Sequence, residues 1–144
     1  LLIREAPKLP RFYQKEVKEA KMRIAIIGAS SRRHKFSNKA VRAFLERGDV
    51  VYPIHPVERE VEGWPVFRRV LDVPGEIEVA SFYVPPAVGM RVLEECAQKG
   101  VSQIWLNPGA RSDELLQRAT ELNLTVKQLC SIVAIGRSPS EFGD

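Results

Sequence analysis

A loop rich in hydroxyl and basic side chains is the part of this sequence best suited to chemistry. It follows a short β-branched run at residues 23–27, begins at Gly28, and leads into a helix expected to start near Ser37. A strand, a tight glycine turn and a helix start bring backbone N–H groups and the positive end of a helix dipole to one point, which favours a phosphate. Arg32, Arg33 and Lys35 add positive charge to the same loop. The loop therefore predicts a site for a nucleotide-like anion.

Two familiar nucleotide-binding signatures are incomplete in this loop. A dinucleotide site reads Gly-x-Gly-x-x-Gly, whereas this chain has Gly28, Ser30 and Arg33 at those positions. His55-Pro56 stands where the acidic residue for the ribose hydroxyls is expected. A P-loop would need Gly-Lys followed by Ser or Thr, and the chain has Arg-His-Lys there. The sequence thus predicts phosphate binding without the machinery for nucleotide hydrolysis.

Short apolar runs recur along the chain, with helical segments between them. The third run is apolar on both faces, as a buried parallel strand should be. Strands and helices that alternate at this spacing predict an α/β fold with a doubly wound five-stranded parallel sheet. The strands are expected at residues 23–27, 50–54, 79–84, 103–106 and 125–129.

Residues with strong preferences for helix ends mark the helices between these strands. Ser37 is expected to cap a helix that stops at Gly48, and Ser112 is expected to cap another. Pro85-Pro86 opens a further helix, which stops at Gly100. Residues 22–136 would form the folded domain, residues 1–21 an N-terminal arm with a short helix, and residues 137–144 a flexible tail.

Size and composition indicate a single globular domain. The 144 residues are 44% hydrophobic and 28% charged, with a net charge of +4. The basic residues are spread along the chain, which disfavours a nucleic-acid partner. No apolar run approaches the roughly 20 residues that cross a bilayer, so no membrane segment is expected. The chain start lacks the apolar segment of a signal peptide and the two cysteines lack metal-ligand spacing, so we expect a cytoplasmic protein without a metal site.

The residues that follow the other strands complete the pattern, because a ligand of a doubly wound sheet lies across the carboxyl ends of the strands. Together with Gly28-Ala29-Ser30, these residues resemble the CoA-binding domain family. That family comprises small stand-alone Rossmann-like proteins similar to the N-terminal domain of the succinyl-CoA synthetase α subunit. The resemblance spans about residues 12–133. Its further motifs are His55-Pro56, Gly63-Trp64-Pro65-Val66-Phe67, Asp72-Val73-Pro74, Tyr83-Val84-Pro85-Pro86 and a late cysteine, Cys130.

The resemblance implies coenzyme A, or an acyl-CoA, as the ligand. His55 departs from the asparagine that relatives carry at this position, and the Asn-Pro-Gly loop after the fourth strand is less typical of the family. Lys35 and Arg33 would each add one charge-assisted contact to a phosphorylated ligand. By resemblance, the phosphates would contact Gly28, Ala29, Ser30 and Ser31, and Lys35 and Ser37 would lie near them. The adenine and ribose would be flanked by His55, Pro56, Val84, Pro85 and Pro86. The pantetheine would be bordered by Asn107, Pro108 and Gly109.

The two cysteines carry different expectations. Cys96 lies on the apolar face of its helix and is expected in the core. Cys130 follows the fifth strand, where it is either a plain buried thiol or a partner for the CoA thiol in a mixed disulfide.

Three functions remain open from the sequence. The first is a non-catalytic CoA-binding protein, since no nucleophile–base pair and no carboxylate pair for acid–base catalysis is evident. The second is an NADP-dependent Rossmann enzyme, in which Arg32 and Arg33 would hold the 2′-phosphate. The third is an accessory or regulatory module for an acyl-CoA synthetase. Either a homo-oligomer or an acyl-CoA enzyme partner is compatible with the sequence.

Overall fold

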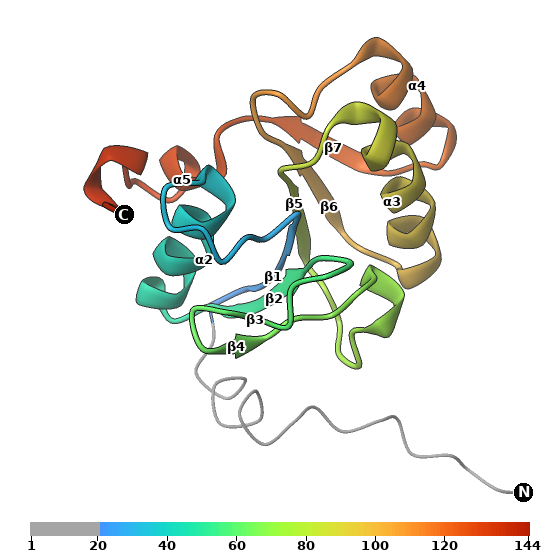
Figure 1. Ribbon diagram of the computed structural model, residues 1–144. Helices are drawn as coiled ribbons and strands as arrows, with labels where there is room; N and C mark the ends of the chain where they lie inside the picture. The colour runs from blue at the N-terminus through green and yellow to red at the C-terminus, as the bar shows by residue number, and fades with distance from the viewer. Residues whose placement is uncertain (1–20) are drawn as a thin grey trace, which may run out of the picture.

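The computed structural model describes residues 21–144, and a sheet of five parallel strands forms its centre (Figure 1). From β1 the chain moves to one edge at β2, then returns beside β1 at β5 and continues outwards to β7. This confirms the predicted doubly wound sheet and places its switch point between β1 and β5. The spatial order is β2 (Val50–Ile54), β1 (Arg23–Ile27), β5 (Val79–Phe82), β6 (Gln103–Leu106) and β7 (Thr125–Gln128).

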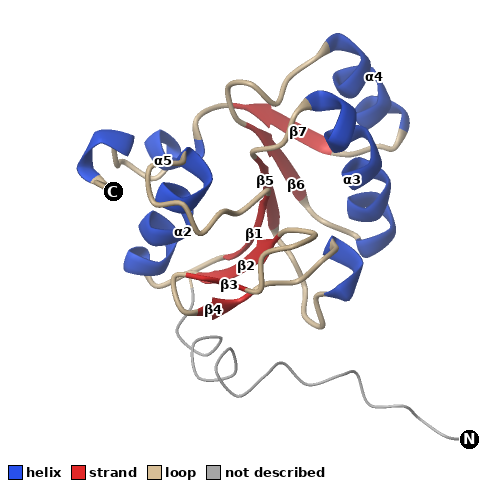
Figure 2. Cartoon of the chain, viewed as in Figure 1, coloured by secondary structure: helices blue, strands red, loops and turns tan. Residues whose placement is uncertain are grey.

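Helices cover both faces of this sheet (Figure 2). On one face lie α2 (Phe36–Arg47) and α5 (Ser131–Ala134), and on the other lie α3 (Pro86–Lys99) and α4 (Asp113–Glu121). Alternate residues of a strand therefore enter different cores. In β1, Ile24 and Ile26 pack into the core with α2, whereas Ala25 and Ile27 pack into the core with α3 and α4. Burial on both faces is the reason that β1, β2 and β5 are almost entirely apolar, whereas the edge strand β7 is mostly exposed and contains Lys127 and Gln128.

The helix ends follow most of the sequence signals. Gly48 and Gly100 end α2 and α3 in the left-handed conformation, with φ of 92° and 80°. The Ser112 side chain caps α4 by accepting a hydrogen bond from the Leu115 N–H at 3.1 Å. The expectation that Ser37 caps α2 is wrong, because α2 begins one residue earlier, at Phe36. Ser37 instead lies buried inside the first turn.

The segment between β2 and β5 contains a hairpin that the sequence analysis did not predict. Strands β3 (Glu60–Val61) and β4 (Trp64–Pro65) pair in antiparallel fashion. Glu62 and Gly63 both have positive φ, 51° and 80°, as a tight two-residue hairpin turn requires. A single turn of 3-10 helix, η1 (Val70–Asp72), follows the hairpin.

The expected flexible tail at residues 137–144 is instead folded against the domain. A turn of 3-10 helix, η2 (Pro139–Glu141), begins at a capping box formed by Ser138 and Glu141. Phe142 is only 4% exposed, and the Arg137 guanidinium lies 4.7 Å from its ring centre. Short-range capping and one apolar anchor therefore hold this segment against the domain.

Between residues 21 and 144, no helix is both long and apolar enough to pass through a membrane.

Candidate functional site

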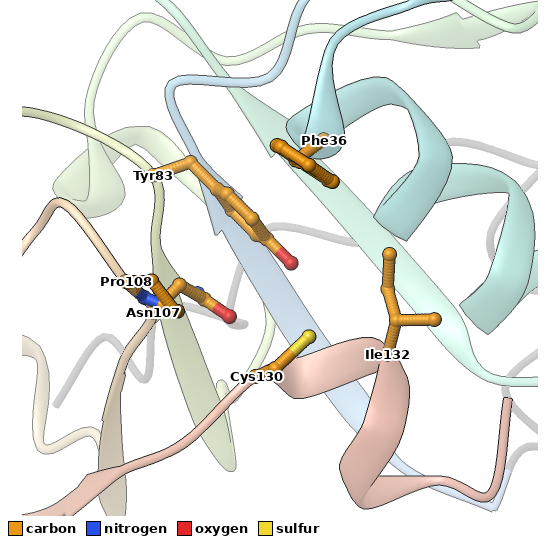
Figure 3. Close-up of a pocket in the computed structure, with 6 residues that line it drawn as sticks. All are labelled: Phe36, Tyr83, Asn107, Pro108, Cys130 and Ile132. Atoms are coloured by element: carbon orange, nitrogen blue, oxygen red, sulfur yellow. The ribbon is translucent and has the colours of Figure 1, made fainter. Parts of the chain in front are cut away.

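Three hollows adjoin one another along the carboxyl ends of the strands, at the switch point. The arginine pocket, of about 250 Å³, lies against β2 and α3 and contains His55, Arg68, Arg69 and Arg91 among its lining residues. The helix-start groove, of about 450 Å³, lies beside the first residues of α2. The cysteine pocket, of about 130 Å³, contains Cys130 (Figure 3). Val84 lines both the arginine pocket and the groove, while Phe36, Tyr83 and Pro108 line both the groove and the cysteine pocket.

Gly28 makes the turn that leads from β1 towards these hollows. Its φ is 86°, and a Cβ at this position would lie 2.8 Å from Val84 Cγ1 and 3.3 Å from the Tyr83 carbonyl oxygen. The N–H groups of Gly28 and Ala29 both donate to the Ile54 carbonyl, at 2.9 and 3.1 Å. These two amides therefore tie the end of β1 to the end of β2, and the absence of a side chain lets the β5 loop approach.

The two serines of the loop are also engaged by the protein itself. The Ser30 hydroxyl accepts a hydrogen bond from the Arg32 N–H at 3.1 Å. The Ser31 N–H and hydroxyl both donate to the carboxylate of Glu58, at 2.6 and 3.0 Å. A carboxylate thus occupies the anion-binding donors of Ser31.

His55 positions that carboxylate. Its Nδ1 accepts hydrogen bonds from the N–H groups of Val57 and Glu58, each at 3.0 Å. This is the turn geometry that an asparagine side chain oxygen also makes with the backbone two residues ahead. The histidine therefore supplies the acceptor of this turn, where the resemblance led us to expect an asparagine.

A polar network braces the loop from α2 and from the hairpin. The buried Asn38 amide donates to the Ser30 carbonyl at 2.9 Å and to the Glu62 carboxylate at 3.1 Å, while its oxygen accepts from Arg42 Nε at 2.8 Å. Arg33 forms an ion pair with Glu62 at 3.5 Å and lines none of the three hollows. The sequence analysis missed Asn38. The available signal was the place of this amide on the mostly apolar, buried face of α2, because a polar side chain there needs hydrogen-bond partners.

The start of α2 offers the best-placed donors for an anion. Lys35 is the N-cap residue, no side chain caps the helix, and its first turn carries no acidic residue. The first N–H groups of a helix have no partner within the helix, and they lie at the positive end of its dipole. Lys35 and Ser37 line the groove here, opposite Val84, Pro85 and Gly109. This arrangement suits a phosphate.

A buried hydrogen-bond network fixes the other end of the site. The Asn107 amide donates to Ser81 Oγ at 2.9 Å and to the Phe82 carbonyl at 2.8 Å, and its oxygen accepts from the Ser131 N–H at 2.8 Å. The Ser81 and Ser131 hydroxyls lie 2.7 Å apart. Asn107 is 1% exposed, so it joins the ends of β5 and β6 to the start of α5. It thereby positions Cys130, the residue before α5.

The cysteine pocket is mostly apolar. Figure 3 shows the Tyr83 hydroxyl and the Cys130 sulfur directed into the same space, with Phe36 and Ile132 on the opposite side. Burial raises the pKa of the Tyr83 phenol, so it stays protonated and neutral. Cys130 is half-buried, whereas Cys96 is fully buried in the core, as predicted.

Most of the predicted site residues line the three hollows at this edge of the sheet, whereas the others lie in the structure around the hollows. Arg68, Arg91 and Glu58 are residues of the candidate site that the sequence analysis missed, because each lies outside the motifs that it used. Tyr83 appeared there only as part of the Tyr83-Val84-Pro85-Pro86 motif, without a role in the site. Ala29, Ser30, Ser31, Arg33 and Pro86 line none of the three hollows. The predicted residues that do line them are Gly28, Lys35, Ser37, His55, Pro56, Val84, Pro85, Asn107, Pro108, Gly109 and Cys130.

Comparison with known proteins finds relatives of two kinds. The α subunit of acetate–CoA ligase [ADP-forming] II from Pyrococcus furiosus is 35% identical over 82 residues, which cover 56% of this chain and 18% of that subunit. The matching acetate–CoA ligase [ADP-forming] from Methanocaldococcus jannaschii is 38% identical over 78 residues, 54% of this chain and 11% of the ligase. The chain therefore spans less than a fifth of the length of these two enzymes.

A solved structure of similar length comes from Pyrococcus horikoshii OT3. This hypothetical protein is 29% identical and superposes with a TM-score of 0.71, over 83% of this chain and 85% of its own. The family model described as CoA binding domain matches residues 22–136 of the chain, which include all three hollows. This protein belongs to the CoA-binding domain family, as a member related to the CoA-binding portion of ADP-forming acetate–CoA ligases.

Proposed function

We propose that this chain binds coenzyme A or an acyl-CoA across the three hollows and that it is not itself a catalyst. The diphosphate would lie at the start of α2, near Lys35 and Ser37. The adenosine would lie towards His55, Pro56, Val84 and Pro85, and the pantetheine would run past Asn107 and Gly109 towards Cys130.

The observation that carries this proposal is the sequence of chemistries along one edge of the sheet. Cationic side chains and an uncapped helix start lie at one end, and an apolar pocket with a thiol lies at the other. Coenzyme A has the same order of groups, with phosphates on the nucleotide and a thiol at the far end of an uncharged arm. The family assignment supports the same ligand.

The absence of catalytic groups at the thiol end supports a binding role. Neither described histidine, His34 nor His55, lines the cysteine pocket, and no acidic side chain of residues 21–144 lines it either. Cys130 therefore lacks a neighbouring base that would activate it as a nucleophile. We infer that the chain presents or stores CoA for an acyl-CoA-forming enzyme, as the matching part of a larger ligase would do within that ligase.

Isothermal titration of the reduced protein with CoA tests the ligand. We expect a saturable heat with one ligand per chain. Folded protein that gives no heat with millimolar CoA would overturn the proposal. NADPH is titrated in parallel, and binding of NADPH in preference to CoA would favour the dehydrogenase alternative. The pairing of Arg33 with Glu62 leaves that alternative less support.

Incubation with acetate, ATP and CoA tests the non-catalytic role. We expect no acetyl-CoA from the chain alone under conditions where CoA saturates it. Turnover by the purified chain would contradict the role proposed here while leaving CoA binding intact.

A further inference from the structure

The arginine pocket contains positive charge that the diphosphate of a ligand at α2 does not use. Arg68 and Arg69 reach it from the segment after β4, and Arg91 reaches it from α3. Val88, Arg91, Val92 and Glu95 share one side of α3 by their helical spacing, and all four line the pocket. This wall of the pocket therefore consists of two valines, one guanidinium and, one turn further along the helix, the Glu95 carboxylate.

Backbone hydrogen bonds place Arg68 beside the end of β2. Phe67, the residue before it, donates its N–H to the Pro53 carbonyl at 2.9 Å and accepts from the His55 N–H at 3.0 Å. This short parallel bridge to Ile54 extends the sheet edge by one residue. Arg68 is thus held at the rim of the pocket by the same strand end that places His55 there.

The two acidic side chains nearby already have partners within the protein. Glu95 accepts a hydrogen bond from the Val70 N–H at 3.1 Å, and Asp72 forms an ion pair with Arg69 at 3.3 Å. Arg68 and Arg91 have no ion pair with any residue of the described part of the chain. The pocket therefore holds three guanidinium groups against one carboxylate, and two of those guanidinium groups have no ion pair, so a doubly charged anion suits it.

We infer that Arg68 and Arg91 bind a phosphomonoester on the ribose of the nucleotide ligand. This inference rests on the proposed function, because it assumes that the ribose lies between His55 and Val84. In coenzyme A that group is the 3′-phosphate, and in NADP it is the 2′-phosphate. A monoester carries close to two charges at neutral pH, whereas each phosphate of the diphosphate bridge carries one, so the paired guanidinium groups favour the monoester. The pocket then selects phosphorylated from unphosphorylated ribose.

Titration calorimetry with CoA and 3′-dephospho-CoA tests this selection. We expect wild-type protein to bind CoA more tightly than dephospho-CoA by about tenfold or more, as the loss of charge-assisted contacts implies. In the double variant Arg68→Gln/Arg91→Gln, we expect the two ligands to bind with nearly equal affinity, close to that of wild type for dephospho-CoA. NADPH and NADH are compared in the same way to separate the two sources of a ribose monophosphate.

Lys127→Gln serves as the matched control, since it removes one exposed charge on β7, away from the three hollows. It should leave the preference for CoA unchanged. Equal affinity of wild-type protein for CoA and dephospho-CoA would overturn the inference and leave the proposed function standing. Failure of both ligands to bind folded protein would instead overturn the proposed function.

Discussion

The two ends of the candidate site are built in different ways, and the difference supports one direction for the proposed ligand. The cationic end consists of exposed arginines and a lysine beside a helix start, and backbone hydrogen bonds at the end of β2 hold the segment that carries two of the arginines. The thiol end is a small apolar pocket that rests on the buried network of Asn107, Ser81 and Ser131. Under the proposed function, a ligand with a charged nucleotide and a slender uncharged arm would therefore bind with its phosphates at α2 and its arm towards Cys130.

The Gly28 turn joins the two ends, and its substitution should have the largest effect. In Gly28→Ala, the new Cβ meets Val84 and the Tyr83 backbone, and φ of 86° is unfavourable for alanine. We expect the free energy of unfolding to fall by about 2–4 kcal/mol, from a left-handed penalty of about 1–2 kcal/mol and a similar overpacking cost. Urea denaturation measures the change.

Gly48→Ala separates these two costs. Gly48 has nearly the same φ, 92°, but no heavy atom lies within 4 Å of its Cβ position. The free energy of unfolding of Gly48→Ala should therefore fall only by the left-handed backbone penalty, about 1–2 kcal/mol. Equal losses at both glycines would show that the β1 turn does not depend on close approach of the β5 loop.

The cationic end should depend on Lys35 more than on Arg33. Lys35 lines the groove without a capping bond, whereas Arg33 is paired with Glu62. We expect Lys35→Ala to weaken ADP and CoA by about 1.5–3 kcal/mol, the range for a hydrogen bond to a charged group. Arg33→Ala should weaken them by less than half as much. The reverse order, measured by titration calorimetry, would move the diphosphate from the helix start to the loop.

Glu58 should oppose phosphate binding at the same end. Its carboxylate occupies the N–H and hydroxyl of Ser31, so its negative charge repels a phosphate that approaches the loop. Glu58→Gln keeps an acceptor and removes the charge, and we expect several-fold tighter ADP binding, or about 1 kcal/mol, at low salt. Glu60→Gln on β3 is the control, with no change expected. Weaker binding to the Glu58 variant would indicate that the carboxylate supports the ligand.

The thiol end should leave phosphate binding almost unaffected. Cys130→Ser is expected to bind ADP as wild type does and to lose any mixed disulfide with CoA. In the native protein, a thiol reagent should modify half-buried Cys130 and not Cys96, because burial raises the pKa of the Cys96 thiol and hides it from solvent. Mass spectrometry of the modified peptides identifies the cysteine, and modification of Cys96 in folded protein would contradict this comparison.

The sequence predicted the scaffold well because its signals are local. Apolar runs, left-handed glycines such as Gly48 and the Ser112 cap each act within a few residues, so the parallel strands and most helix ends could be read directly. The hairpin at β3 and β4 escaped because its two-residue strands are too short to show alternation. The folded tail depends on Phe142 packing against Arg137 and Arg42, contacts that are not visible from spacing.

The sequence predicted the edge of the sheet at which the candidate site lies, but it predicted less well which partners its side chains have. The edge of the sheet follows from topology, so His55, Val84 and Cys130 lie where a ligand should cross it. The donors that remain available to a ligand depend on pairing between residues far apart in the sequence, such as Ser31 with Glu58 and Arg33 with Glu62. For that reason the sequence named Arg33 and Lys35 alike, whereas only Lys35 lines a hollow, and it missed the arginines of the adjoining pocket, which belong to no motif.

Amide NMR during titration with CoA and with ADP tests most directly whether one ligand spans both ends. We expect CoA to shift the signals of Lys35 and Ser37 and those of Cys130 and Ser131 together, at the same ligand concentration. ADP should shift only the first pair, and Gln117 on α4 should stay unmoved with both ligands. If CoA shifted the helix start and left Cys130 and Ser131 unchanged, or shifted neither end, the proposed orientation would be contradicted.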